Sequence, residues 1–255
     1  MAGVLAGLAG LGVIGAVVWF NLTHSPIEVD KDTLCPKTGS WSTTVVLIDV
    51  SDPLPKVAQE DVKNQIAEEV RTVPKFGLLE LRLLDPKVDG GQVLFLRCNP
   101  GDGRDLSEII ANPEQERKKF EEGFQKPLTG LLASAVRADP ADTSPIMETV
   151  QWISVKEFAN TAQQKQKPRL IIVSDMIQHS ADYSLYKGDP GFERYRHSAS
   201  YEVLRTDLHQ ADVTVFYVSR KNQPESADSF VEFWEQWFAD NNGNLIRVKK
   251  VQGAQ

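Results

Sequence analysis

The first 27 residues contain no Asp, Glu, Lys or Arg, and the first charged side chain is Glu28. Within them, residues 2–22 are Ala, Gly, Val, Leu, Ile, Trp and Phe, broken only by Asn21. A run of about 20 such residues is long enough to span the core of a bilayer. A cleaved signal peptide would have a basic start and an Ala-x-Ala before His24, and both are absent. We therefore predict a single-pass membrane anchor over residues 2–22, which Gly3 and Gly7 would allow to pair into a homo-oligomer.

The chain also lacks a cluster of basic residues. It has 28 Lys and Arg against 35 Asp and Glu, a net charge of -7. Without a basic stripe to hold a phosphate backbone, nucleic acid is excluded as a partner. The loop 99–103 is rich in glycine, but it matches neither the P-loop nor the dinucleotide-binding fingerprint, so we interpret it as a turn.

Cysteine is scarce, with only Cys35 and Cys98. Cys35 precedes the first predicted strand and Cys98 ends a later one, so a disulfide is geometrically possible if the strands are antiparallel in one sheet. Two separate buried thiols remain the alternative. Disulfides form in oxidising compartments, so the cysteine pair favours an extracytoplasmic domain. The charges on the two flanks of the anchor do not indicate on which side of the membrane the domain lies.

After a polar tether over residues 23–42, the domain at 43–255 alternates strands with helices, which is typical of a parallel sheet covered on both faces. The short link between the second and third strands permits only an antiparallel hairpin. We predict a doubly wound α/β fold with a mostly parallel six-stranded sheet and one antiparallel edge strand. The predicted strands are 43–49, 76–84, 92–98, 169–174, 212–218 and 245–251. The predicted helices are 60–73, 113–138 (broken at Pro127), 146–161, 201–209 and 226–240.

Polar side chains follow two of these strands. Asp49 and Ser51 come directly after the first strand, and they either face a cation or a phosphate or only turn the chain and cap the next helix. Asp175 follows the fourth strand. Thr143 and Ser144 precede a helix, and Ser144 suits the N-cap of that helix. If the first and fourth strands are neighbours, these loops face one point at the carboxyl edge of the sheet. Such an oxygen-only set suits Mg²⁺, with Mn²⁺ as the alternative.

This pattern resembles the von Willebrand factor type A (VWA) family and its metal-ion-dependent adhesion site. The family motif is Asp-x-Ser-x-Ser, then a Thr, then an Asp, and here the first part is Asp49-Val50-Ser51-Asp52-Pro53. The resemblance covers residues 43–251 by strand order, including the antiparallel third strand. Pro53 departs from the motif because it has no hydroxyl, so one direct ligand is lost.

The resemblance implies a role for each candidate ligand. Asp49 would bind the metal through water or orient the other ligands. Ser51 and Thr143 or Ser144 would be hydroxyl ligands, and Asp175 an acidic one. A degenerate site on a retained scaffold is the alternative.

Three functions follow from these observations. The first is a membrane-tethered interaction or assembly module, in which an acidic side chain of a partner protein completes the metal's coordination. The second is a metal-dependent hydrolase of the phosphoesterase type, with His179 as general base. The third is a metal-free structural subunit of a membrane complex. The set contains no paired nucleophile and base, so we expect binding rather than catalysis.

Overall fold

A computed structural model describes residues 27–49, 51–104, 112–137, 141–159, 164–186, 190–220 and 227–254. The predicted membrane anchor over residues 2–22 lies outside these ranges. Within them, no helix combines the length and the apolar character that a membrane crossing requires.

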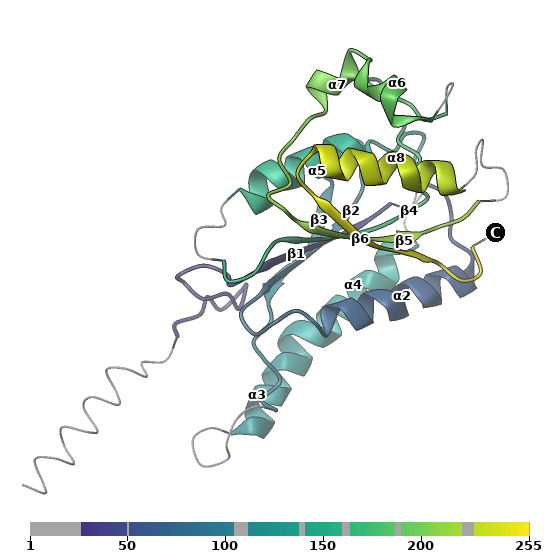
Figure 1. Ribbon diagram of the computed structural model, residues 1–255. Coiled ribbons are helices and arrows are strands. Elements are labelled where there is room, and N and C mark those ends of the chain that lie inside the picture. The colour runs from purple at the N-terminus through teal and green to yellow at the C-terminus, as the bar shows by residue number, and fades with distance from the viewer. Residues whose placement is uncertain are drawn as a thin grey trace, which may run out of the picture.

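The described strands form one six-stranded sheet in the order β3-β2-β1-β4-β5-β6 (Figure 1). All neighbouring pairs are parallel except β2 and β3, which are antiparallel. This confirms the predicted mostly parallel sheet with one antiparallel edge strand. The strands are β1 (Thr43–Ile48), β2 (Leu78–Leu83), β3 (Gln92–Cys98), β4 (Arg169–Ser174), β5 (Asp212–Tyr217) and β6 (Asn244–Lys250).

Helices cover both faces of the sheet, because its central strands are apolar on both sides. In β1, Val45 and Leu47 face one core while Val46 and Ile48 face the other. Figure 1 shows α5 (Ile146–Ile153) and α8 (Ala227–Asp240) over the first core, with α6 (Phe192–Arg196) and α7 (Ser200–Val203) beyond them. It shows α2 (Lys56–Val70) and α4 (Lys126–Ala135) over the second core, and α3 (Pro113–Phe120) leading into α4.

Pro127 does not break its helix, contrary to the prediction. The backbone stays helical from α3 to α4 through a π-helical turn, η1 (Glu121–Gln125). Pro127 has no N–H for the carbonyl of Gly123, four residues earlier. The guanidinium of Arg97 on β3 donates to that carbonyl instead. A similar π-helical turn, η2 (Ser154–Phe158), extends α5.

The predicted helix 201–209 is also wrong over most of its length, because α7 ends at Val203. His209 and Gln210 have positive φ angles of 53° and 59°, which a right-handed helix does not allow. Asn241, at the end of α8, holds this segment: its Oδ1 accepts the N–H of Thr206 at 2.7 Å and its carbonyl accepts the N–H of Leu208 at 2.8 Å.

Cys35 and Cys98 form a disulfide, the pairing that the sequence left open. Their Cα atoms are 4.7 Å apart, and the N–H of Cys98 donates to the carbonyl of Thr33 at 2.8 Å. The bond fastens the segment before β1 to the end of the edge strand β3.

Candidate functional site

The polar cluster lies at the carboxyl edge of the sheet, where the strand order reverses between β1 and β4. These two strands are parallel neighbours, with Ile48 opposite Val173. Asp49 therefore leaves the sheet beside Asp175, and its N–H donates to the carbonyl of Val173 at 2.8 Å. Ligands of doubly wound sheets bind at such a crevice. The predicted convergence of the two aspartates is thus present.

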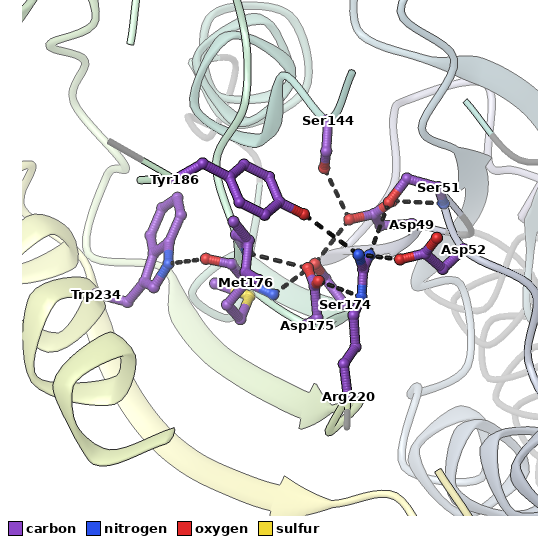
Figure 2. Close-up of polar contacts among 11 residues, drawn as sticks. Asp49, Ser51, Asp52, Ser144, Ser174, Asp175, Met176, Tyr186, Arg220 and Trp234 are labelled. Carbon is purple, nitrogen blue, oxygen red and sulfur yellow. Dashed lines mark hydrogen bonds and ion pairs between the residues drawn. The ribbon is translucent and has the colours of Figure 1, made fainter. Parts of the chain in front are cut away.

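Asp49 is the hub of the cluster. Its side chain is buried, and its Oδ2 accepts hydrogen bonds from Ser144 Oγ and Ser174 Oγ, both at 2.8 Å (Figure 2). Its Oδ1 accepts the N–H of Ser51 at 3.0 Å. Asp49 therefore accepts three hydrogen bonds from serines of three different segments.

Ser144 contacts Asp49 instead of capping α5. The residue before that helix is Pro145, and no side chain caps the helix. Thr143 is half-buried and lies in the wall of an adjoining cavity. Ser51 makes two contacts in the cluster: its N–H donates to Asp49 Oδ1, and its hydroxyl accepts from Arg220. The structure therefore brings Asp49, Ser51, Ser144 and Asp175 together and places Thr143 beside them.

Asp175 precedes a strained residue that several contacts hold in place. Met176 has a φ of 61°, the left-handed region that a long side chain seldom adopts. Its N–H donates to Ser174 Oγ at 2.8 Å, and its carbonyl accepts Trp234 Nε1 of α8 at 2.7 Å. Asp175 Oδ1 accepts the N–H of Ile177 at 3.0 Å. Backbone strain of this kind persists only when the surrounding structure enforces it, as these contacts do here.

Arg220 occupies the middle of the cluster, and the sequence analysis did not assign it a role (Figure 2). Its Nε is 2.5 Å from Asp175 Oδ2. Nη2 donates to Ser51 Oγ at 3.2 Å and Nη1 to Tyr186 Oη at 3.3 Å. Nη1 also forms an ion pair with the carboxylate of Asp52. The sequence feature that could have indicated Arg220 is its position just after β5, because β5 is the strand next to β4.

Ser174, which stands beside Asp175 in the predicted loop after the fourth strand, was not assigned a role as a ligand. It ends β4, it is fully buried, and its hydroxyl links Asp49 to the turn at Met176. A serine as the last residue of an apolar strand was the only sign of this role in the sequence.

Two cavities adjoin Arg220, with volumes of about 300 Å³ and about 290 Å³. The first has the carboxylates and an apolar rim, and among its lining residues are Asp49, Asp52, Pro53, Leu54 and Asp175. The second is lined by hydroxyls and rings, among them Ser51, Thr143, Ser144, His179 and Tyr186. The two cavities therefore give access to the cluster, and the Arg220 guanidinium lines both of them.

Charges in the cluster shift the pKa values of its members. Burial, and then the neighbouring carboxylate of Asp49, raises the pKa of Asp175 to about 8. Hydrogen bonds from the N–H of Ile177 and from the Ser174 side chain act in the opposite direction, because they favour the ionised carboxyl. Burial lowers the pKa of Arg220, and the Asp49 carboxylate opposes that change. Burial and the two aspartates raise the pKa of Tyr186.

The oxygens of the cluster, as arranged, fit a guanidinium and do not fit a divalent metal. Arg220 nitrogens contact Asp175 Oδ2 and Ser51 Oγ, and Asp49 Oδ2 already accepts the hydroxyls of Ser144 and Ser174. An octahedral ion needs such oxygens free to face it. Among the described residues, no three His, Cys, Asp or Glu side chains are grouped to hold a metal. Ligation of Mg²⁺ or Mn²⁺ by the cluster stays a prediction.

His179 was the predicted general base of the hydrolase alternative. Its Nδ1 is 3.0 Å from Ser184 Oγ, and its ring meets that of Tyr186 edge-on at 5.2 Å. Its backbone forms a two-way bridge with Ser144. The imidazole thus contacts Ser184 and Tyr186, and no hydrogen bond among the described residues joins it to Asp49 or Asp175.

Comparison with known proteins gives a likeness of fold alone. No family model and no curated protein matches the chain. Among solved structures, it is similar to the ArnB paralog VWA2 from Sulfolobus acidocaldarius, with 11% identity over 69% of this chain and 35% of that one and a TM-score of 0.36. It is also similar to proximal thread matrix protein 1 from the mussel byssus, with 10% identity, coverages of 83% and 44% and a TM-score of 0.39. The match spans less than half the length of either protein.

The sheet itself fits the VWA-like α/β fold that the sequence resemblance implied. It has six strands, it is mostly parallel, and its single antiparallel strand lies at one edge.

Proposed function

We propose that this chain is a membrane-tethered protein-interaction module, which binds its partner at the carboxyl edge of the sheet. The observation that carries the proposal is the position of the polar cluster at the β1–β4 crevice, with partly exposed groups around it. A VWA-like scaffold is commonly an interaction module, which agrees with this use of the edge.

The rim of the crevice offers residues that suit an interface. Tyr186 is 45% exposed although Arg220 fixes its hydroxyl, so a large and already ordered ring is available to a partner. Tyrosine and arginine are enriched among the residues that dominate binding energies. Asp52, also exposed, stands on the other side of the same guanidinium.

The metal, the anchor and the compartment are further parts of the proposal. In the version that the sequence resemblance implied, an acidic side chain of the partner completes a Mg²⁺ site. In the metal-free version the cluster binds its partner as it stands, and the contacts of Arg220 favour this second version. The uncharged run at 2–22 supports a tether, and the disulfide supports an oxidising, extracytoplasmic location.

Capture of partners by the full chain tests the proposal. After cross-linking and detergent extraction, a protein captured by the wild type should no longer be captured by Tyr186→Ala. We expect this variant to bind the partner about 30-fold more weakly, which is the effect of removing a dominant interface residue. Val155→Ala is the matched control, because Val155 is 57% exposed and lies at the other end of the helix that starts beside Ser144. Equal capture by both variants would show that the partner does not bind at this rim.

The same capture separates the two versions of the proposal. Recovery that is unchanged in EDTA supports the metal-free version. Recovery that requires Mg²⁺ and is lost with Asp175→Ala supports the metal-dependent one.

A further inference from the structure

The guanidinium of Arg220 lies where the loops after β1, β4 and β5 meet. Its contacts come from three other segments of the chain: Ser51 and Asp52 after β1, Asp175 after β4, and Tyr186 before α6. A planar guanidinium presents five donors in fixed directions, so a single group can satisfy acceptors on several sides. We propose that Arg220 is the resident cation of this site and takes the place of a divalent metal ion.

The carboxyl oxygen that a metal would need is already in contact with a cation. The side chain of Asp175 is 1% exposed, and its Oδ2 is 2.5 Å from Arg220 Nε. A divalent ion at this oxygen would meet the positive charge of the guanidinium at contact distance, so it would have to displace Arg220. Displacement would remove that residue from Ser51, Asp52 and Tyr186 as well, because one side chain holds all of these contacts.

The hydroxyls support the same assignment. Ser144 and Ser174 both donate to Asp49 Oδ2 at 2.8 Å, which leaves that carboxylate oxygen engaged by two protons. Pro53 has no hydroxyl where the family motif has a serine. Asp175 Oδ2 accepts no hydrogen bond from the described residues, so its contact with the guanidinium is an ion pair, and a metal ion would have to displace Arg220 to reach this oxygen.

Arg220 also reaches the surface. Its side chain is 25% exposed, and it contributes to the walls of both adjoining cavities. The cation is thus fixed to the chain and does not depend on the metal content of the surroundings. Its role in holding the loops does not require a binding partner, so a failed capture experiment would leave it unaffected.

Thermal unfolding of the full chain, with Mn²⁺ as the probe, tests this role. The wild type should unfold at the same temperature, within about 1 °C, in EDTA and in about 1 mM Mn²⁺, because nothing is bound. A resident metal at about 100 times its dissociation constant would raise the unfolding temperature by at least about 5 °C. Such a rise, abolished by Asp175→Asn, would overturn the proposal.

Two substitutions complete the test. Arg220→Met should unfold about 10 °C below the wild type, since it leaves buried carboxylates without their cation. Arg117→Met is the control at an exposed helix position, where the ion pair is 3.8 Å long, and its unfolding temperature should change by less than about 2 °C. An Arg220→Met protein as stable as the wild type would also overturn the proposal. If Arg220→Met does not fold, the wild-type response to Mn²⁺ decides alone.

Discussion

Replacing Trp234 with Ala should lower the free energy of unfolding by about 5 kcal/mol, the largest single effect that we expect in this chain. Trp234 lies on α8, is 1% exposed, and packs edge-on against Phe233 and Trp237 at 5.6 and 5.3 Å between ring centroids. Truncation removes this buried surface and leaves a cavity in the larger core.

The effect should also reach the candidate site. Trp234 Nε1 donates to the carbonyl of Met176 at 2.7 Å, and Met176 is the strained residue next to Asp175. Without the indole, that carbonyl is buried and unpaired, and the turn at Met176 keeps only the hydrogen bonds of the Met176 and Ile177 N–H groups.

Trp234→Phe separates packing from hydrogen bonding, because it keeps most of the ring and removes the N–H. We expect it to cost about 1–3 kcal/mol in urea unfolding, against about 5 for the alanine. If both variants were within about 0.5 kcal/mol of the wild type, α8 would not be part of the core as described.

Replacing Arg82 with Met should cost about 3–5 kcal/mol at pH 8, because it leaves a buried carboxylate without its partner. Arg82 lies on β2 and is 2% exposed. Its Nη2 is 2.6 Å from Glu80 Oε1 and 2.9 Å from Glu157 Oε1, and its Nη1 donates to the carbonyl of Gly90 at 2.9 Å. The ring of Trp152 is 4.4 Å from the guanidinium carbon.

The cost should fall at low pH, because Glu80 can take up a proton. Burial first, and then the carboxylate of Glu157, raises the pKa of Glu80 from 4.5 to about 7, against the opposing effect of Arg82. At pH 5 the folded protein therefore holds Glu80 neutral, and removal of Arg82 leaves no charge stranded there. Urea unfolding at pH 5 and pH 8 measures the difference.

The wild type should show the same linkage with a definite sign. A carboxyl whose folded pKa is raised stabilises the fold fully below its ordinary value of 4.5, and this contribution is lost as the pH rises to about 7. Between pH 4.5 and about pH 7, the free energy of unfolding of the wild type should fall by at most about 3 kcal/mol relative to that of Glu80→Gln, which cannot titrate at this position. A difference that is constant with pH, or that grows in the other direction, would contradict the raised pKa.

The sheet could be predicted because its signals are local. The central strands are apolar on both faces, as Val45 to Ile48 show, and the short link before Gln92 allows only a hairpin. The position of Asp49 and Asp175 followed from the same reasoning, since both directly follow buried strands. These features depend on neighbouring residues and on the rules of strand connection.

The contacts that define the candidate site are not local, and the sequence did not reveal them. Arg220 meets Ser51 from 169 positions away, and Ser174 meets Asp49 from 125. A basic residue after β5 has no periodicity that marks it as buried among carboxylates. Ser144 had two possible uses, helix cap or site, and only its distance to Asp49 decides between them.

Pro127 shows a different limit. Proline usually interrupts a helix because the carbonyl four residues earlier loses its donor. Here Arg97, on a strand far away in the sequence, takes that carbonyl, and a π-helical turn absorbs the change in spacing. The rule was sound, but tertiary structure supplied the missing partner.

A double-mutant cycle between Asp175 and Arg220 tests the central claim most directly, which is that a guanidinium of the chain itself organises the candidate site. Unfolding free energies of the wild type, Asp175→Asn, Arg220→Met and the double variant, all in EDTA, give the coupling energy. We expect at least about 2 kcal/mol, because Asp175 is buried and in direct contact with the partly exposed guanidinium. Additivity within about 0.5 kcal/mol would contradict the account, because the two side chains would then not depend on each other.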